Sequence, residues 1–154
     1  MLHAHGFTDC FQQRIIGMYN KEASEVQING FRSSLFPIHS SITQGCPLSM
    51  QLFALCLNPL IQTLERELKG IHIGRRHAKT TVIAYADDVT IFLNSPADVR
   101  KLQETLLIYE SATAAKVNMR KSRALALGAW DTTTHEMDVP YHTDVKILGF
   151  HFTK

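Results

Sequence analysis

The sequence predicts an α+β fold in which antiparallel hairpins alternate with amphipathic helices. Two short apolar runs, rich in β-branched and aromatic residues, flank the adjacent acids Asp87 and Asp88, which is typical of a hairpin. Another hairpin is indicated by Asn29-Gly30, the dipeptide that suits a tight two-residue turn. The segments 50–69 and 96–115 carry apolar residues at intervals of three and four, the period of an amphipathic helix. This order favours an antiparallel sheet packed against helices.

The composition is that of an ordinary globular domain. Of the 154 residues, 45% are hydrophobic and 19% are charged, which argues against a disordered chain. The formal net charge of +2 says little about partners, but the basic residues cluster in segments 69–79 and 116–123. Such clusters suit a phosphate backbone, and they also occur on solvated protein faces.

The cysteines indicate an intracellular protein. Three cysteines, with no C-x-x-C pair, fit free structural thiols in a reduced compartment, the cytoplasm or the nucleus. The eight histidines complete no zinc set with them. No signal peptide opens the chain and no apolar run approaches the length of a membrane span, so we expect no membrane partner.

The N-terminal part predicts one helix and one hairpin. Thr8 is a good N-cap for a helix that ends near Asn20. After Asn29-Gly30, the segment 31–42 is expected to return as an irregular strand that Pro37 interrupts. The tetrapeptide at positions 3–6 ends in glycine like the end of a helix, so we expect the chain to be truncated upstream.

A loop with glycine and proline, at positions 44–49, precedes the longest predicted helix. Ser49 is expected to cap a helix from Met50 to Lys69, with a kink at Pro59 and an end at Gly70. A glycine-containing loop before a helix N-terminus is a ready anion site, and it is also an ordinary connection.

The remaining chain predicts further strands and one more helix. A short strand at 71–73 and a basic loop at 74–79 precede the hairpin at 80–93, and Ser95 and Pro96 begin a helix that ends before Lys116. Strands are expected at 124–127 and 145–152, with Trp130 exposed in the loop between them. Gly149 inside the last strand indicates a bulge or a close backbone neighbour.

The acid pair is a poor choice for a turn that serves stability alone. Two adjacent carboxylates repel each other unless a cation lies between them. Mg²⁺ is a hard cation that takes carboxylate oxygens together with substrate phosphates, so Asp87 and Asp88 form a candidate metal site. The alternative is a solvated turn, where aspartate is a common residue.

Four motifs in order resemble the reverse transcriptase of a non-LTR retrotransposon. They are Gln44-Gly45-Cys46-Pro47-Leu48-Ser49 before a long helix, Tyr85-Ala86-Asp87-Asp88 on a hairpin, the polar corner with Asn118, Lys121 and Ser122, and Lys146–Phe152 centred on Leu148-Gly149. A lone Tyr-Ala-Asp-Asp is a weak signal, whereas this ordered set covers nearly the whole chain.

The resemblance implies an RNA-directed DNA polymerase with a palm-like antiparallel sheet, incomplete at the N-terminus. Residues 1–127 would form part of the palm, and residues 128–154 would end it with primer-grip-like strands that lead to the thumb. The complete enzyme would use an RNA template, a DNA primer, deoxynucleoside triphosphates and Mg²⁺, with Mn²⁺ as an alternative metal, in a two-metal transfer.

The resemblance also implies a role for each matching residue. Asp87 would bind metal directly with Asp88 beside it, and Lys121 would act on the triphosphate side, although a solvated lysine is equally consistent with the sequence. Contacts with the nucleotide, the template or the primer end would come from Gln44, Gly45, Pro47, Tyr85 and Ala86. Leu148 and Gly149 would press against the primer strand.

One departure from the family limits this prediction. The family has a third essential carboxylate on an upstream strand, and nothing in residues 1–43 fits it, since Asp9 is better explained as a first-turn helix acid. We therefore expect the 154-residue chain alone to be inactive. The alternatives are a decayed or domesticated RNA-binding fragment without catalysis, and an unrelated α+β metal-binding domain.

Overall fold

The computed structural model describes residues 2–20, 23–38, 46–73, 78–130 and 139–154. The chain divides into two compact units, Met1–Cys56 and Leu57–Lys154, and the boundary falls within helix α2 (Ser49–Glu67). In the described part, three α-helices accompany small two-stranded sheets, which confirms the α+β class at this level. None of the described helices has the length and apolar character that crossing a membrane requires.

The first unit holds the predicted N-terminal helix and hairpin. A short 3-10 helix, η1 (Leu2–His5), precedes α1 (Asp9–Tyr19), and the Thr8 hydroxyl accepts the N-cap hydrogen bond from the Phe11 amide at 3.4 Å. Strands β2 (Gln27–Ile28) and β3 (Phe31–Arg32) pair across Asn29 and Gly30, whose φ angles are 50° and 84°. Positive φ at both central residues is the geometry of a type I′ turn, and the predicted hairpin at Asn29-Gly30 is confirmed.

The predicted strand at 31–42 is interrupted more than expected. The chain leaves β3 and forms β4 (Phe36–Pro37), which pairs antiparallel with β1 (Ala23–Ser24). Positions 39–42 lie outside the described residues. Helix α2 begins at Ser49 itself, one residue before the predicted start, and it ends at Glu67 with Pro59 inside it.

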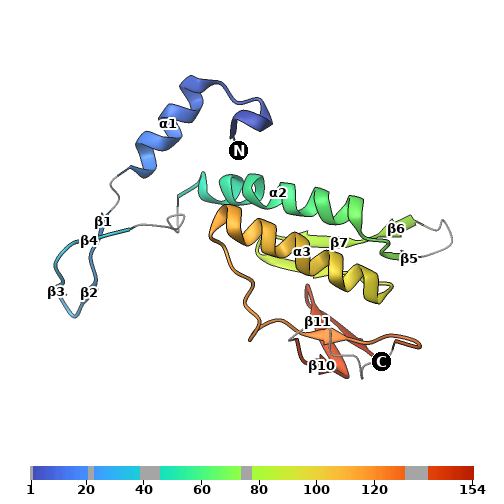
Figure 1. The fold of residues 1–154 in the computed structure, drawn as a ribbon. Helices are drawn as coiled ribbons and strands as arrows, with labels where there is room; N and C mark the ends of the chain where they lie inside the picture. Colours follow the sequence, from blue (N-terminus) through green and yellow to red (C-terminus); the bar gives the residue numbers. More distant parts are fainter. Residues whose placement is uncertain (1, 21–22, 39–45, 74–77, 131–138) are drawn as a thin grey trace. The chain divides into compact units, whose positions relative to one another are not determined.

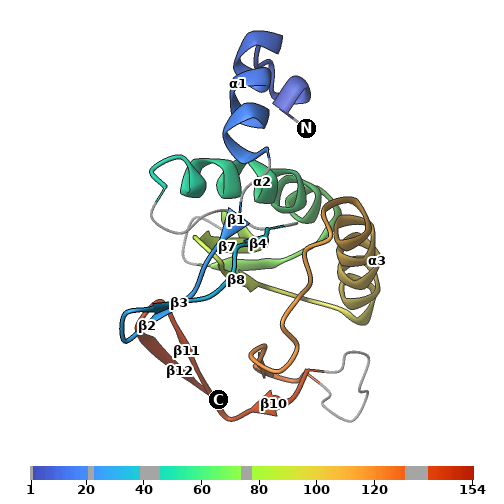
Figure 2. The ribbon, with the colours of Figure 1, turned by 90° about the vertical axis from the view of Figure 1, so that its left-hand side faces the viewer.

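Two helices form the core of the second unit. Helix α3 (Pro96–Thr113) lies alongside the C-terminal part of α2, and the hairpin of β7 (Val82–Tyr85) and β8 (Asp88–Ile91) lies against them (Figures 1 and 2). Leucine and valine side chains from the apolar stripes of both helices are buried, namely Leu57, Leu60, Leu64, Val99 and Leu102, as is Leu68 directly after α2. The stripes are those that the helical periodicity predicts.

Short strands complete the second unit. Strands β5 (Ile71–Ile73) and β6 (Ala78–Thr80) pair antiparallel, so Lys79 lies in a strand rather than in the predicted loop. Strands β9 (Ala124–Leu125) and β10 (Tyr141–His142) pair in parallel, which departs from the expected antiparallel arrangement.

The prediction of one strand over residues 145–152 was wrong. Strands β11 (Asp144–Ile147) and β12 (Phe150–Thr153) form an antiparallel hairpin, and Leu148 and Gly149 make its turn with φ of 48° and 90°. Leucine occupies the first central position of this turn, so the apolar run of the sequence continues across the turn. The sequence therefore carried no signal that the strand ends there. Trp130 is part-buried rather than exposed, since its Nε1 donates to the Tyr141 hydroxyl at 3.3 Å.

A buried carboxylate joins the two helices and the hairpin. Asp98, in the first turn of α3, is 1% exposed. Its Oδ1 accepts from the Lys69 amide at 3.2 Å, and its Oδ2 accepts from the Asn94 amide at 3.0 Å. The same side chain therefore holds the end of α2 and the segment that leaves β8.

Candidate functional site

The candidate site is the turn between β7 and β8. Tyr85 pairs with Asp88 in the last rung of the ladder, so Ala86 and Asp87 are the two central turn residues. Ala86 has a φ of 52°, whereas Asp87 does not have a positive φ. A positive φ at the first central residue alone is the pattern of a type II′ turn, where glycine is the usual residue. The two acids are thus not equivalent, because Asp87 lies at the tip and Asp88 begins β8.

The strand register separates the hairpin into two faces. Residues that pair directly across an antiparallel ladder point to the same side. The pairs Val82–Ile91 and Ala84–Val89 therefore share one face, and Ile83–Thr90 and Tyr85–Asp88 share the other. On the second face Ile83 is 39% exposed and Tyr85 is 69% exposed. Tyr85 and Asp88 consequently lie together on a face that the second unit leaves accessible.

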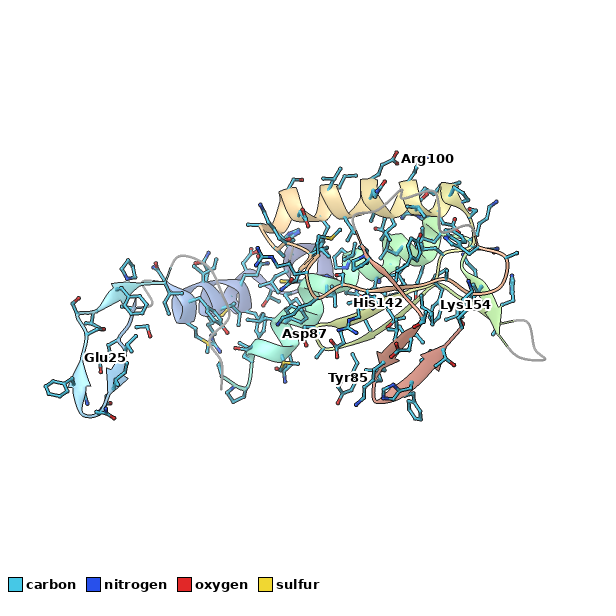
Figure 3. All side chains as sticks on the ribbon, turned by 90° about the horizontal axis from the view of Figure 1, so that it is seen from below. Glu25, Tyr85, Asp87, Arg100, His142 and Lys154 are labelled. Carbon is cyan, nitrogen blue, oxygen red and sulfur yellow. The ribbon has the colours of Figure 1, made fainter. Side chains whose placement is uncertain are left out.

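The carboxylates of Asp87 and Asp88 are exposed and unpaired within the described structure. Neither one forms an ion pair or a hydrogen bond with a described side chain. Figure 3 shows Asp87 and Tyr85 as they project from the end of this hairpin, while Arg100 points away from it on α3. Two hard oxygen donors side by side match the ligand preference of Mg²⁺. Within the described ranges no group of three His, Cys, Asp or Glu side chains could hold a metal, so the pair supplies only part of a coordination sphere.

Lys121 lies in the turn that follows α3, and it is exposed. Its amide donates to the Asn118 carbonyl at 3.0 Å and to the Asn118 Oδ1 at 3.3 Å. Ser122 also bonds to the Asn118 carbonyl, through its amide and through its hydroxyl, each at 3.0 Å. The three residues of the predicted polar corner therefore form one hydrogen-bonded turn, which leaves the Lys121 ammonium in solvent.

Of the predicted loop at positions 44–49, the structure describes residues 46–49. Gln44 and Gly45 lie outside the described residues, and Pro47 is an exposed turn residue at the entrance to α2. Cys46 accepts a hydrogen bond from the Tyr19 hydroxyl, with 3.9 Å between oxygen and sulfur. The Leu48 amide, and after it this hydroxyl, lower the pKa of the Cys46 thiol from its ordinary value.

Leu148 and Gly149 form the turn of an amphipathic hairpin. Val145 with Phe152 and Ile147 with Phe150 make one apolar face, while the opposite face carries the pairs Asp144–Thr153 and Lys146–His151. Leu148 is 47% exposed and Phe150 is 73% exposed. The tip of this hairpin thus presents apolar side chains to its surroundings rather than reactive ones.

Sequence reasoning did not single out Asp98, which braces the segment leading out of the candidate hairpin. The signal was present, because Ser95 and Asp98 have the spacing of a capping box. The Ser95 hydroxyl indeed accepts from the Asp98 amide at 3.3 Å. In a capping box the acidic side chain would accept from the amide of the N-cap residue, Ser95. The Asp98 carboxylate instead accepts from the amides of Asn94 and Lys69, which only the tertiary structure could reveal.

Comparisons with known proteins agree with the motifs. The family model of reverse transcriptase (RNA-dependent DNA polymerase) matches residues 2–152. An uncharacterized 149 kDa protein of transposon TX1 from Xenopus laevis is 30% identical over 83% of this chain. A retrovirus-related Pol polyprotein from the type-2 retrotransposable element R2DM of Drosophila melanogaster is 29% identical over 78%, and one from the type-1 retrotransposable element R2 of Popillia japonica is 24% identical over 81%.

The chain spans about a tenth of the first two relatives, 10% and 11% of their lengths, and 20% of the third. The match of the family model nonetheless extends over almost the entire chain, and it includes the hairpin with both acids, the polar corner and the final hairpin. The resemblance to the reverse transcriptase domain of non-LTR retrotransposons is therefore confirmed, and the chain belongs to the reverse transcriptase (RNA-dependent DNA polymerase) family.

Proposed function

We propose that this chain supplies the catalytic hairpin of an RNA-directed DNA polymerase that joins deoxynucleotides by a two-metal mechanism. The observation that carries the proposal is the β7–β8 turn, where Asp87 occupies the tip and Asp88 begins the next strand, both exposed and both without an ion pair in the described structure. The antiparallel pairing of β7 with β8, and the hydrogen bond from the Phe92 amide to the Thr81 carbonyl at 2.8 Å, hold the backbone behind the acids, so their position would not depend on a ligand.

The donor set agrees with Mg²⁺, with Mn²⁺ as a substitute. Mg²⁺ is commonly held by one or two carboxylates, with phosphate oxygens of the substrate and waters completing six ligands. Asp87 would bind metal directly and Asp88 would lie beside it. When bound, two such ions would stabilise the attacking and the leaving oxygens of an in-line displacement.

The neighbours of the acids would position the primer. Ala86 carries only a methyl group, so a primer end could approach the turn closely. Tyr85 is 69% exposed beside Asp88, and its ring could support the primer terminus. Positioning of this kind can account for a large part of a rate enhancement, because the reacting groups no longer have to find each other.

The other site residues have supporting roles in this proposal. The exposed Lys121 ammonium would neutralise the triphosphate or protonate the leaving pyrophosphate. Gln44, Gly45 and Pro47 would contact the incoming nucleotide and its template base. The apolar tip at Leu148 and Gly149 would hold the primer strand by shape.

At the level of domains, we propose that residues 1–127 form part of a polymerase palm and that residues 128–154 end it. The complete protein would act on an RNA template, a DNA primer and deoxynucleoside triphosphates in the cytoplasm or the nucleus. The three free cysteines, Cys10, Cys46 and Cys56, suit such a reduced compartment.

We expect the 154-residue chain alone to lack polymerase activity, because two carboxylates from one hairpin would orient metal poorly. Primer extension on an RNA template with Mg²⁺ or Mn²⁺ tests this directly. Extension by the purified chain that Asp87→Ala abolishes would overturn the inactivity and would support the role of Asp87.

The catalytic role itself is tested in a longer polypeptide that carries this chain and extends primers. Asp87→Asn should reduce the extension rate by several orders of magnitude, whereas Glu104→Gln, an exposed carboxylate on α3, should leave it unchanged. Equal rates for the wild type and Asp87→Asn would refute the metal role. The chain would then be better explained as a non-catalytic RNA-binding relative.

A further inference from the structure

We infer that the turn after α3 binds the phosphate backbone of a nucleic acid strand through Lys116, Arg120 and Arg123. This surface, residues 116–123, is called the basic turn. The inference rests on the proposed function, which makes nucleic acid the partner, and it adds Lys116, Arg120 and Arg123 to the residues that the proposed function uses.

Within the part of the chain that the structure describes, no acidic side chain neutralises the cations of the basic turn. Lys116, Arg120 and Arg123 are exposed, and none of them forms an ion pair or a side-chain hydrogen bond with any described residue. The sequence has no aspartate or glutamate from position 111 to position 130. The nearest preceding acid is Glu110, whose Oε1 accepts a hydrogen bond from the Val117 amide at 2.9 Å. Four positive side chains, Lys121 included, thus share eight residues and have no counterion among the described side chains.

The basic turn also keeps its shape without these side chains. Ala114 ends α3 in the left-handed conformation and donates to the Glu110 carbonyl at 2.9 Å. Asn118 then accepts from Lys121 and Ser122, as described for the polar corner. Figures 1 and 2 show this segment, in orange, as it leaves α3 in an irregular path. Backbone and polar contacts hold the turn, so the long cationic side chains remain free for a partner.

Lys79, which belongs to the other basic cluster of the sequence, and Lys101, which lies on α3, differ in this respect. The Lys79 ammonium donates to the Glu65 carbonyl at 3.1 Å, and the Lys101 ammonium donates to the Glu67 carbonyl at 3.0 Å. Both carbonyls belong to the last turn of α2, where cations stabilise the negative end of the helix dipole. These lysines therefore have a structural role, which the residues of the basic turn do not share.

An extended polyanion fits the basic turn better than a small anion does. Small ligands are usually held in concave sites with converging polar groups. The basic turn instead spreads its charge along an exposed segment, which suits successive phosphates of one strand and requires no base contacts. Because RNA and DNA both offer this backbone, the experiment uses one probe of each kind.

Fluorescence anisotropy with the 154-residue chain tests the inference, without metal or nucleotide. The probes are a labelled single-stranded RNA and a labelled DNA duplex of equal length, titrated at several KCl concentrations. The variant Lys116→Gln/Arg120→Gln/Arg123→Gln keeps Lys121. The matched control, Arg14→Gln/Arg100→Gln/Lys154→Gln, removes the same charge from other exposed positions. Circular dichroism establishes that both variants remain folded.

The expected result is a selective loss of salt-dependent binding. If each of the three side chains neutralises one phosphate, the slope of log affinity against log salt falls by about 2 on single-stranded RNA and by about 3 on duplex DNA. Affinity at ~0.1 M salt falls roughly 100-fold or more, while the control triple keeps most of the wild-type slope. A loss on one probe alone identifies which backbone the basic turn contacts.

Other outcomes overturn the inference. Unchanged affinity and slope in the basic-turn variant would refute it, as would an equal loss in the control triple, which would indicate bulk charge only. Displacement of the probes by inorganic pyrophosphate at micromolar concentration would indicate a small-anion site instead. Probe binding by the basic-turn variant and primer extension by Asp87→Asn are separate measurements, so failure of this surface would leave the catalytic role of Asp87 to be judged by primer extension.

Discussion

Replacement of Asp98 by alanine tests whether one buried carboxylate stabilises the second unit. The change removes two acceptors, for the Lys69 amide at 3.2 Å and the Asn94 amide at 3.0 Å, at a position that is 1% exposed. Hydrogen bonds to a charged group contribute about 1.5–3 kcal/mol each, and a buried donor left unpaired costs about 1–3 kcal/mol. These contributions overlap, so we expect the free energy of unfolding to fall by roughly 3–5 kcal/mol.

Urea denaturation of the 154-residue chain, followed by circular dichroism and by fluorescence of Trp130, measures this loss. Trp130 is the single tryptophan and lies in the same unit as Asp98. Since small domains have about 5–15 kcal/mol of stability, Asp98→Ala should unfold at much lower urea or fail to fold. Asp98→Asn keeps the shape and one acceptor, and it should lose about half as much and remain measurable.

Glu104→Gln is the matched control, because it neutralises an exposed acid on the same helix. Its free energy of unfolding should change by less than about 0.5 kcal/mol. If Asp98→Asn proved as stable as Glu104→Gln, the carboxylate would not hold the two amides in solution. The account of how α2, β8 and α3 are joined would then be wrong.

Two further predictions concern a glycine pair and a cysteine pair. Gly70 and Gly149 both have positive φ, but a Cβ at Gly70 would collide with the Thr80 carbonyl and the Thr81 side chain, whereas Gly149 has nothing within 4 Å. Gly149→Ala should cost only about 1–2 kcal/mol of backbone strain, and Gly70→Ala should cost clearly more in the same urea assay. Equal losses would show that the close approach at Gly70 does not matter. The Leu48 amide and the Tyr19 hydroxyl lower the pKa of Cys46, and burial raises the pKa of Cys56. Because the thiolate is the reactive form, iodoacetamide should modify Cys46 at lower pH than Cys56, by mass spectrometry of peptides, and Tyr19→Phe should move the Cys46 profile to higher pH. Coincident pH profiles in the folded chain would contradict these environments.

Local signals in the sequence predicted the element boundaries well. The N-cap at Thr8, the turn at Asn29-Gly30 and the start of α3 at Ser95-Pro96 all lie where expected. Each of these depends on the chemistry of a few adjacent residues, such as a hydroxyl that accepts an amide or a glycine that adopts positive φ. Such preferences act before any tertiary contact forms, so a single sequence suffices to predict them.

The features that the sequence missed depend on distant contacts or on turn residues with weak preferences. The parallel pairing of β9 with β10 joins residues 124–125 to residues 141–142, which no local pattern indicates. The turn at Leu148-Gly149 has a leucine where asparagine would have marked it. For the candidate site, the sequence predicted the hairpin and both acids. It did not predict that Asp87 lies in the turn, beside Ala86, while Asp88 is the first residue of β8.

The residues that adopt positive φ distinguish turns whose residue types favour stability from turns whose residue types do not. Among the described residues, four non-glycine residues have positive φ: Asn29, Ala86, Ala114 and Leu148. Asparagine tolerates this conformation, whereas alanine and leucine pay about 1–2 kcal/mol there. Ala86 precedes Asp87, Leu148 forms the predicted primer contact, and Ala114 caps α3 two residues before the basic turn. The unfavourable residues therefore lie in or near the three surfaces to which we assign nucleotide, primer and nucleic acid binding, as expected where function rather than stability selects the residue.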